Sequence, residues 1–346
     1  IVVPDPIATL RQPLGPYLHD GVTMTATRFD VIGIGNAIVD VIAHVDDDFL
    51  EAEGLEKGAM TIVETERSIA LYDRMGSSVK CSGGSAANTI AGVASLGGRG
   101  AFIGKVRDDH LGDIFRHEIR AAGVTFDTPA ATSGPQTATS LILVSPDAQR
   151  TMQTFLGACV GLGPDDIDED AITAAEVTYL EGYLWDPPEA KKACIKAAEI
   201  AHAAGREVSL SLSDPFCVDR HRADFLDLTK NHVDILFANE EEIKSLYQVD
   251  NFDHALQAVQ RDGRVAALTR SEKGSVIVSG DEVHVINADP VDSVVDTTGA
   301  GDAFAAGFLF GFTNGANLAA AARIGSTAAA EMISKIGARP MSHSKT

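Results

Sequence analysis

Apolar and polar positions in the C-terminal half of the chain follow two different periods. Short runs rich in β-branched residues predict strands, and longer runs with an apolar residue every three or four positions predict helices. In chain order these are Val177–Glu181, Glu189–Ala204, Glu207–Ser211, Arg222–Thr229, Ile235–Ala238, Glu240–Tyr247, Phe252–Asp262 and Val265–Thr269. Strands that alternate with helices form a parallel sheet covered by helices on both faces. The pattern therefore predicts an α/β fold with a mostly parallel central sheet.

The N-terminal half fits this alternation only in part. Strands are expected at Val31–Gly35 and Ala101–Gly104, and helices at Ser85–Leu96 and Asp113–Ala122. Two further extended regions, near residues 38–62 and 136–157, have no helix between strands. The second reads as a hairpin of Thr137–Val144 with Thr151–Phe155. We expect these two regions to form a small β-sheet lid, and a last extended pair, Ser275–Val278 with Glu282–Ile286, to precede residues 291–312.

The chain has 346 residues, a length compatible with one large domain or two smaller ones. Residues 1–27 are rich in proline and glycine, show no clear period and lack the basic start and apolar stretch of a secretory signal. They are expected to be an extension outside the fold, with Met24 as a natural start. The remainder, 28–346, is expected to be one domain that includes the lid.

Residues 291–312 contain the most informative stretch of the chain. Val291–Val295 is apolar enough for a strand end, and Ala303–Phe312 suits a buried helix. Between them, Gly299, Ala300 and Gly301 carry almost no side-chain bulk. A glycine turn at a helix start exposes backbone N–H groups and the positive end of the helix dipole, which together bind anions. Asp302 repels a phosphate, so it makes sense there as a base that deprotonates a hydroxyl.

For an isolated Gly-x-Gly-Asp, a plain helix cap would be the better interpretation. The full string at 296–304, Asp-Thr-Thr-Gly-Ala-Gly-Asp-Ala-Phe, resembles the signature of the ribokinase-like (pfkB) carbohydrate and nucleoside kinases. The resemblance implies a ribokinase-like three-layer αβα sandwich with a small β-sheet lid, and ATP and Mg²⁺ as cofactors. It also implies that Asp302 is the catalytic base, that Gly299, Ala300 and Gly301 form the anion hole, and that Thr298 lies beside the nucleotide.

A second glycine motif lies near the predicted acceptor site. Gly83-Gly84-Ser85-Ala86-Ala87-Asn88 opens a helix, and as an isolated motif it would indicate only close packing. It resembles the first signature of the same family, which implies that Asp40, Gly84 and Asn88 hold the ribose-type hydroxyls. An aspartate such as Asp40 inside an apolar run is costly to bury without a partner. Gly33-Ile34-Gly35 is not a dinucleotide fingerprint, because position 38 is isoleucine and an extended run follows.

The nucleotide side rests on further family resemblances. Asn239 and Glu242, which could be only an acidic helix start, resemble the Asn-x-x-Glu motif that orders Mg²⁺ and phosphate. The turn Thr269 to Gly274 resembles a nucleotide-binding turn, with Ser271 where the family has glycine, so the backbone path there is an open question. Arg150 is expected over the transferred phosphate. A helix at Ala322–Lys335, with Ser326, is expected beside the base of ATP. A monovalent cation such as K⁺ is a further option in this family.

The acceptor could be a nucleoside, a hexose or a pentose. Two segments resemble the adenosine-phosphorylating branch rather than the ribose-phosphorylating one: Gly35–Asp40, and Ser211–Phe216, whose phenylalanine would lie on the base. By position, the acceptor site would comprise Asn36, Ile38, Asp40, Gly83, Gly84, Ser85, Asn88, Met152, Leu156 and Phe216. The alternatives are a sugar kinase and a catalytically silent binding protein on the same fold; for each apolar residue, plain core packing is an equal alternative.

Charge and cysteine content limit the partners. The 28 basic and 49 acidic side chains give a formal net charge of −21, which argues against nucleic acid and anionic membranes as partners. The four cysteines are widely separated and show no metal-ligand spacing, so free thiols in a reducing cytoplasm are expected. No apolar run reaches membrane-spanning length. The expected partners are small molecules, with a monomer or a homodimer as the assembly.

Overall fold

The computed structural model describes residues 27–147 and 149–334, and over these ranges the chain forms a sheet of eight strands and a smaller sheet of five. The larger sheet has the strand order β13-β12-β11-β10-β9-β8-β1-β5, and the hairpin β12–β13 runs antiparallel to the rest. Its strands are β1 (Phe29–Ile34), β5 (Gly100–Ile103), β8 (Ala175–Glu181), β9 (Glu207–Ser211), β10 (Ile235–Asn239), β11 (Val265–Thr269), β12 (Ser275–Ser279) and β13 (Glu282–Ile286).

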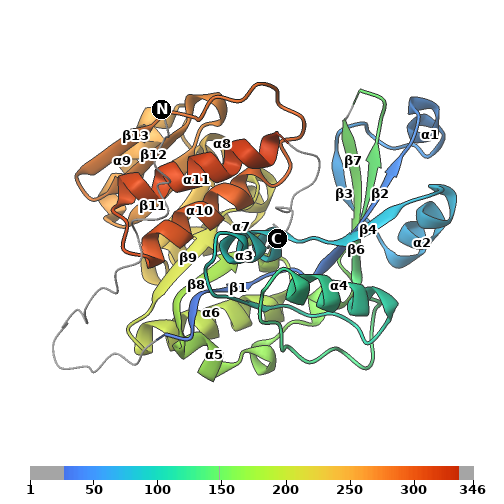
Figure 1. The fold of residues 1–346 in the computed structure, drawn as a ribbon, viewed down its shortest axis with the longest axis horizontal. Coiled ribbons are helices and arrows are strands. Elements are labelled where there is room, and N and C mark those ends of the chain that lie inside the picture. The colour runs from blue at the N-terminus through green and yellow to red at the C-terminus, as the bar shows by residue number, and fades with distance from the viewer. Residues whose placement is uncertain (1–26, 148, 335–346) are drawn as a thin grey trace, which may run out of the picture.

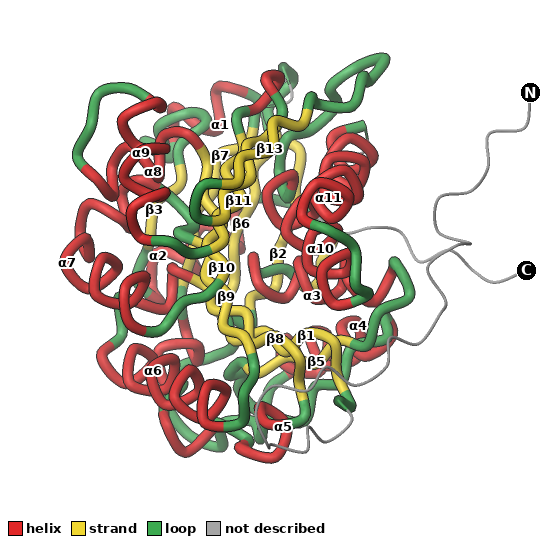
Figure 2. Tube along the Cα trace, turned by 90° about the vertical axis from the view of Figure 1, so that its left-hand side faces the viewer, coloured by secondary structure: helices red, strands yellow, loops and turns green. Residues whose placement is uncertain are grey.

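Helices cover both faces of the larger sheet (Figure 2). One face carries α3 (Ser85–Ser95), α10 (Ala300–Thr313) and α11 (Leu318–Ile333). The other carries α5 (Glu169–Thr173), α6 (Pro188–Ala203), α7 (Pro215–Asn231), α8 (Glu240–Tyr247) and α9 (Phe252–Asp262). Short 3₁₀ turns complete the connections at η1 (Gly157–Gly161), η2 (Pro164–Asp166), η3 (Gly182–Trp185) and η4 (Ser271–Lys273). The expected three-layer α/β fold is confirmed, with a mostly parallel larger sheet.

The smaller sheet stands beside the larger one (Figure 1). Its order is β3-β7-β6-β2-β4, from the strands β2 (Ile38–His44), β3 (Met60–Ile62), β4 (Val79–Ser82), β6 (Ala138–Val144) and β7 (Arg150–Phe155). The helices α1 (Asp47–Ala52), α2 (Thr65–Arg74) and α4 (His110–Ala121) accompany it. In β2, buried residues alternate with half-buried ones up to Ala43, so one face of the strand is packed in the protein and the other is partly accessible.

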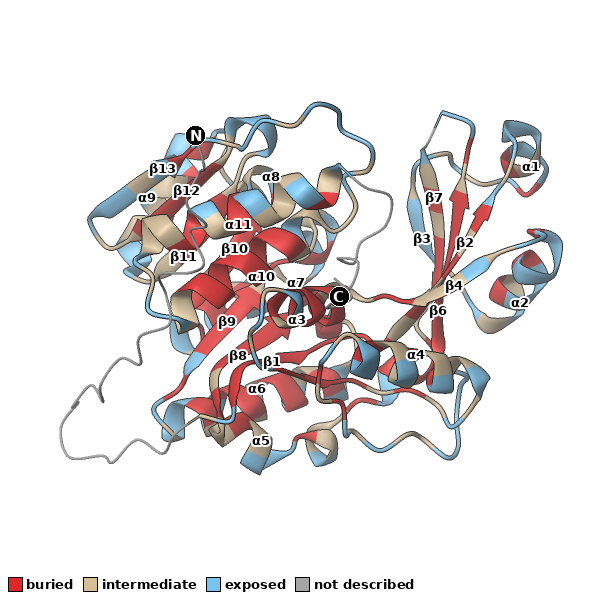
Figure 3. Ribbon diagram, viewed as in Figure 1, coloured by how far each residue is buried: buried red, intermediate tan, exposed pale blue. Residues whose placement is uncertain are grey.

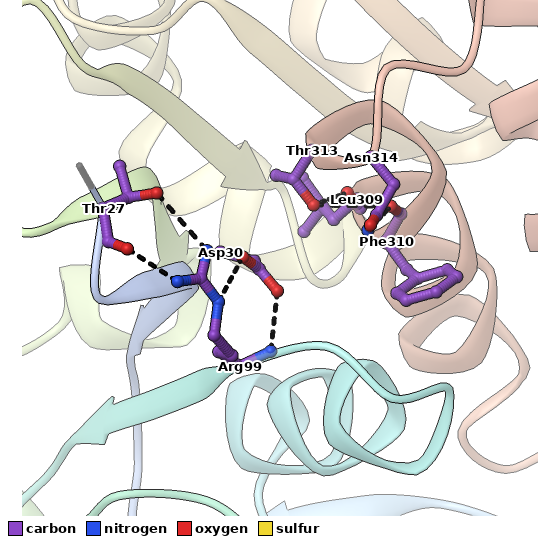
Figure 4. Close-up of polar contacts among 7 residues, drawn as sticks. All are labelled: Thr27, Asp30, Arg99, Leu309, Phe310, Thr313 and Asn314. Atoms are coloured by element: carbon purple, nitrogen blue, oxygen red, sulfur yellow. Dashed lines mark hydrogen bonds and ion pairs between the residues drawn. The ribbon is translucent and has the colours of Figure 1, made fainter. Parts of the chain in front are cut away.

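Helix α10 is packed in the interior of the protein, in close contact with α11. Residues Ala303–Gly311 of this helix are all buried (Figure 3). A Cβ atom on Gly307 would lie 2.7 Å from Cα of Gly325 in α11, so two glycines allow the helices to touch. The end of α10 is tied back to its own last turn, since Thr313 Oγ1 donates to Leu309 O at 2.9 Å and Asn314 Nδ2 donates to Phe310 O at 2.7 Å (Figure 4).

Several expected elements differ from those observed. Val291–Val295 is not a strand end, because Val294 and Val295 lie in an irregular, exposed segment between β13 and α10. Helix α7 begins at Pro215, seven residues before the prediction, because Asp214 caps it and a non-helical residue, His221, interrupts it. Helices α1, α2 and α5 and strand β4 were not predicted, while β3 lies inside the extended region expected near residues 38–62. The expectation for residues 1–26 and the end of the last helix at Lys335 lie outside the described residues.

Two further properties bear on the predicted partners. Among the described residues, no helix is both long enough and apolar enough to cross a bilayer. All four cysteines lie in this part of the chain and none forms a disulfide: Cys159, Cys194 and Cys217 are buried, and Cys81 is half-buried. The predicted free thiols are thus observed.

Candidate active site

The N-terminus of α10 has no side-chain cap. Gly299 caps the helix in the left-handed conformation (φ 77°) and offers no side chain to the first-turn N–H groups. Within the described residues, no atom lies within 4 Å of a Cβ placed on Gly301, so space is free beside the turn. Thr298 N donates to Asp296 Oδ1 at 3.0 Å, and this bond stabilises the turn before the helix. Ala300 N donates to Thr297 O at 3.2 Å, and no side chain caps the helix. An uncapped helix start next to free space can bind an anion such as phosphate.

Asp302 is held at both carboxylate oxygens by the first turn of α3. Ser85 Oγ donates to Oδ1 at 2.6 Å, and Asn88 Nδ2 donates to Oδ2 at 3.2 Å. Asp302 lies 217 positions after Ser85 and 214 after Asn88 in sequence, yet α3 and α10 pack side by side on the same face of the larger sheet. Two donors stabilise the ionised carboxylate and fix its orientation, which is what a general base needs.

Two glycines bring Asp40 and Asn36 against this helix start. Gly83 N donates to Ile38 O at 2.8 Å, and a Cβ on Gly83 would overlap the carboxyl group of Asp40. Gly84 has a positive φ of 92°, and a Cβ there would overlap the carbonyl oxygen of Asn36. A side chain at Gly83 would displace Asp40 of β2, and a side chain at Gly84 would displace Asn36, which follows β1. The structure thus gathers Asn36, Asp40, Gly83 and Gly84 around the start of α3.

Glu181, which the sequence analysis passed over, is part of the same cluster. It ends strand β8, and its side chain is fully buried. Its carboxylate accepts hydrogen bonds from Asn36 Nδ2 at 2.7 Å and from Ala86 N at 2.8 Å. Burial raises the pKa of Glu181 to about 7, and the charge of Asp302 contributes to the rise. The available signal was an acidic residue at the end of an apolar strand, as Asp40 is an acidic residue inside one.

The face of the smaller sheet that carries Asp40 is partly apolar. Ile38 lies two residues from Asp40, so both side chains point to one face. The register pairs Asp40 with Ser140, Ser140 with Thr154, and Ile142 with Met152, which puts Met152 on this face as well. Ser140 Oγ and Thr154 Oγ1 lie 3.1 Å apart within hydrogen-bonding distance. Leu156 follows β7 and is half-buried at the start of η1.

Phe216 lies in the first turn of α7, after the carboxyl end of β9, and its side chain is 74% exposed. Strands β8 and β9 are parallel neighbours, so this turn and Glu181 follow the same edge of the sheet. The preceding Ser213 has φ 71°, a conformation that is rare for serine and is found most often at functional sites. A large aromatic side chain left in solvent at this edge is free to cover a ligand.

Arg150 links the smaller sheet to the signature segment. It is the first residue of β7, and its guanidinium forms an ion pair with Asp296, the first residue of the signature. The side chains are only 11% and 8% exposed, respectively. A buried Arg–Asp pair keeps its partners together because either charge alone would be costly to bury. The arginine therefore lies beside the turn of α10 rather than on a solvated hairpin tip.

Asn239 and Glu242 form a capping box at the start of α8. Asn239 Oδ1 accepts from Glu242 N at 2.8 Å, while Glu242 accepts from Asn239 N at 2.9 Å and from Asn239 Nδ2 at 2.6 Å. Burial raises the pKa of Glu242 to about 7. Within the described residues, no group of three or more His, Cys, Asp or Glu side chains could enclose a metal ion. One carboxylate with an amide suits Mg²⁺, which keeps much of its water and binds phosphates.

The turn after β11 has a left-handed backbone conformation at Ser271, where the family motif has glycine, and a positive φ at Gly274. Ser271 has φ 51°, in the left-handed region, and Gly274 has φ 84° with no room for a Cβ beside the carbonyl oxygen of Ile286. Thr269 ends β11 directly before this turn. Arg270 is not a solvated cation, since its Nε donates to Glu240 Oε2 at 2.8 Å and its guanidinium lies 3.9 Å from the centroid of the Phe252 ring.

Ser326 lies in α11 with its side chain buried, and its Oγ donates to Asn287 O at 3.4 Å. The next residue, Thr327, donates to Asp289 Oδ2 at 2.6 Å. Both bonds hold the segment that follows β13 against the helix. Ser326 is therefore on the same side of the larger sheet as Gly299, but the hydrogen bonds recorded for it are structural.

Comparison with known proteins bears on the chemistry of this cluster. The sequence model of the pfkB family carbohydrate kinases matches residues 62–345 of the chain. The adenosine kinase of Saccharomyces cerevisiae is 28% identical over 331 residues, which span 89% of this chain and 95% of the yeast protein.

Two solved structures share more than half of their aligned residues with the chain. An adenosine kinase from Sinorhizobium meliloti is 54% identical with a TM-score of 0.86, and a probable sugar kinase protein from Rhizobium etli CFN 42 is 52% identical with the same TM-score. In each case the match covers 91% of this chain and 96% of the other. The similarity fits both a nucleoside and a sugar as acceptor.

Proposed function

The chain belongs to the pfkB family of carbohydrate kinases and is thus an ATP-dependent kinase that acts on hydroxyl groups; from this premise we propose that its acceptor is the 5′-hydroxyl of adenosine, with AMP and ADP as products. The observation that carries the proposal is Asp302. Its carboxylate, held by Ser85 and Asn88, lies in the first turn of a helix that has no side-chain cap and has free space beside Gly301.

The proposed mechanism assigns a step to each group in the cluster. Asp302 takes the proton from the acceptor hydroxyl as that oxygen attacks the γ-phosphorus of ATP in line. The N–H groups of Gly299, Ala300 and Gly301 bind the oxygens of the transferring group, where negative charge is concentrated. Asp40 and Asn88 hold the hydroxyls of the acceptor sugar ring. Closure of the smaller sheet as a lid excludes water and limits ATP hydrolysis.

The nucleotide is proposed to lie between α10, α11 and the turn after β11, with Thr298, Thr269, Ser271, Gly274 and Ser326 along its path. Arg150 would exchange Asp296 for the transferred phosphate when the lid closes. Asn239 and Glu242 provide oxygen donors of the kind that Mg²⁺ prefers, and they would hold it on the phosphate side. When bound, Mg²⁺ neutralises phosphate charge; a K⁺ requirement is a further part of the proposal.

Two features favour a nucleoside over a free sugar. Phe216 is an exposed aromatic ring at the edge where the acceptor would lie, and a purine offers the flat apolar surface that such a ring stacks on. Ile38 and Met152 add apolar surface on the opposite side, on the face that carries Asp40. A base thus has an apolar environment on two sides. The 54% identity to an adenosine kinase also favours this acceptor.

A pfkB-type sugar kinase acting on ribose, fructose or a related sugar is the second candidate. The hydroxyl pair Ser140 and Thr154 lies on the same face as Asp40, and polar groups around the ring are what a free sugar needs. The 52% identity to a probable sugar kinase favours this alternative. The reaction at Asp302 would be the same, and only the acceptor would change.

The decisive experiment compares acceptors with purified protein, ATP and Mg²⁺. We expect adenosine to have the highest kcat/KM, inosine to be poorer, and ribose and fructose to be turned over at least about 100-fold less efficiently, because they cannot fill the base site. Phosphorylation of ribose or fructose without that of adenosine would reject the nucleoside and leave the sugar kinase. A Phe216→Ala variant should raise KM for adenosine about tenfold while leaving KM for ATP unchanged.

The proposed setting is purine salvage in the cytoplasm. Four cysteines without a disulfide fit a reducing compartment. The acidic surface implied by a net charge of −21 fits small-molecule substrates better than nucleic acid.

A further inference from the structure

Helix α3 begins without a capping side chain of its own. Its N-cap residue is Gly84, which has no side chain to accept the N–H groups of the first turn. A helix normally satisfies one of these groups with a serine, threonine, aspartate or asparagine at this position. Glycine is required here by the positive φ and by the close approach of Asn36. The acceptor for the first turn must therefore come from elsewhere in the fold.

Glu181 supplies that acceptor from a different element. Its Oε2 accepts from N of Ala86, the second residue of α3, at 2.8 Å, which is the bond that a side-chain cap would make. Its Oε1 accepts from Asn36 Nδ2 at 2.7 Å. One buried carboxylate at the end of β8 thus joins the end of β1 to the start of α3. A Cβ on Gly35 would lie 2.6 Å from the Ala86 Cβ, so these elements are in close contact.

The capped turn is the one that holds Asp302. Ser85 precedes Ala86 and Asn88 follows it by two positions, and these two side chains donate to the two carboxylate oxygens of Asp302. A shift of the α3 start would move both donors together. The bond to Asn36 also fixes the orientation of that amide, because only its nitrogen can donate to a carboxylate.

Resting on the proposed function, we propose that Glu181 is a positioning residue for phosphoryl transfer: it caps α3 from strand β8, and through Ser85 and Asn88 it sets the position of Asp302, while it orients Asn36 toward the acceptor. Both of its partners are N–H donors, so only the ionised carboxylate accepts both bonds. If Glu181 is protonated or replaced by glutamine, its own O–H or N–H donor faces Asn36 Nδ2 or Ala86 N. One of the two hydrogen bonds is then lost.

Five ionisable groups whose pKa Glu181 raises are themselves neutral at physiological pH. These groups are the thiols of Cys159, Cys194 and Cys217 and the phenols of Tyr179 and Tyr183. Burial raises the pKa of Cys194 and Cys217 to about 12 and the pKa of the other three groups further still. The charged side chain that acts on Glu181 is Asp302 of α10. A change in activity tied to Glu181 therefore has few competing origins.

The test compares Glu181→Gln and Glu181→Asp with Asp30→Asn. Asp30 is a matched control: it is a buried carboxylate at the opposite end of β1, where it accepts Arg99 N at 2.7 Å and pairs with the Arg99 guanidinium (Figure 4). Glu181→Gln should lower kcat about 10- to 100-fold, since a small misplacement of reacting groups has this effect, with KM for ATP unchanged. Glu181→Asp keeps the negative charge on a shorter side chain, so its kcat should lie between those of Glu181→Gln and the unmodified protein.

Two readouts separate positioning from mere stability. Hydrogen exchange of the peptide containing Ala86 should become faster in Glu181→Gln and stay unchanged in Asp30→Asn. The acid limb of kcat/KM should move to lower pH in Glu181→Gln, because the Glu181 carboxyl, whose pKa is raised to about 7, is no longer there to be protonated. Asp30→Asn should lower the melting temperature and keep kcat.

Normal kcat and a normal pH profile in Glu181→Gln, with Asp302→Asn inactive, would overturn the positioning role and leave the proposed function standing. Activity retained in Asp302→Asn would instead reject the proposed function. Should Glu181→Gln fail to fold, Glu181→Asp decides: kcat equal to that of the unmodified protein would reject the proposal.

Discussion

At the scale of single residues, Asp302 has the strongest assignment. Both of its oxygens accept hydrogen bonds from α3, and it lies next to the open N-terminus of its own helix. A base held in this way has its orientation fixed before the substrate arrives. The entropy of orienting this carboxylate is therefore lost when the protein folds and not when the substrate reacts.

An Asp302→Asn variant should lose its general base while keeping its shape, because asparagine has nearly the same size. We expect kcat to fall by about 10²- to 10⁴-fold, the usual contribution of a general base. Dissociation constants for ATP and adenosine, measured by calorimetry, should change by less than about threefold. Asp168→Asn makes the same change at the N-cap of α5, where asparagine can still cap the helix; it serves as the control and should keep full kcat. Turnover by Asp302→Asn at the normal rate would contradict the assignment.

Glu176, at the other end of β8, gives a prediction about stability. Burial raises its pKa to about 7, and the charge of Asp30 adds to the rise while Arg206 and Arg99 oppose it. The folded protein therefore binds this proton more tightly than the unfolded chain, so Glu176 lowers the free energy of unfolding as pH rises from about 4.5 to about 7. In Glu176→Gln this loss disappears.

Urea denaturation at pH 5 and pH 7.5 measures the effect. The decrease in unfolding free energy between the two pH values should be smaller in Glu176→Gln than in the unmodified protein. Glu189→Gln on α6, where the glutamate forms an i,i+3 pair with Lys192, is the surface control. An identical decrease in all three proteins would show that Glu176 does not carry a perturbed proton.

At the scale of elements, the approach of α10 and α11 depends on glycine. Gly307→Val would place methyl groups where Gly325 now lies, and α10 would have to move. We expect a loss of about 1–3 kcal/mol in unfolding free energy, the usual cost of overpacking, and a lower kcat because α10 carries Asp302. Gly161→Ala is the control, since no described atom lies within 4 Å of its added Cβ. A Gly307→Val protein as stable as the control would contradict this account of the helix contact.

The sequence predicted the elements of the larger sheet better than those of the smaller one. Buried parallel strands such as Ile235–Asn239 are continuous apolar runs, so their pattern is unambiguous. Strand β3 has three residues, all exposed, and β4 contains Lys80, Cys81 and Ser82. Such edge strands are defined by pairing with β7 and β2, which lie far away in sequence. Local sequence patterns do not identify those partners, so β4 was not predicted and the bounds of β3 could not be given.

The candidate site shows the same division. Glycine turns and the signature string predicted the residues whose backbone geometry is special. Glu181 belongs to no turn or motif, and its importance depends on Ala86 and Asn36, which reach it only in the folded protein. The expected strand at Val291–Val295 failed for a related reason: β-branched residues favour strands, but this segment has no neighbouring strand to pair with.

At the scale of the whole molecule, the Arg150–Asp296 ion pair joins the two sheets. It connects β7 with the segment that leads into α10, across the gap where the substrates would bind. Both side chains are mostly buried, so the pair should be coupled more strongly than an ion pair on the surface. Opening of the smaller sheet must break or exchange it.

A double-mutant cycle measures this coupling. Arg150→Met, Asp296→Asn and the double variant should give an interaction free energy of about 1–3 kcal/mol in urea unfolding. The exposed pair Lys191–Asp224 on α6 and α7 is the control and should give less than about 1 kcal/mol. Equal coupling in both pairs would mean that the two sheets are not held together by this contact.

The distribution of cysteines has a practical consequence. Three of the four thiols are buried, and the fourth, Cys81, lies on β4 directly opposite Asp40, with both side chains on one face of the smaller sheet. A maleimide dye added to the native protein should therefore react at a single position without mutagenesis. Because that position borders the expected acceptor site, its labelling rate should fall when acceptor is present. The unmodified protein thus carries a built-in attachment site for a dye whose rate of reaction reports substrate occupancy.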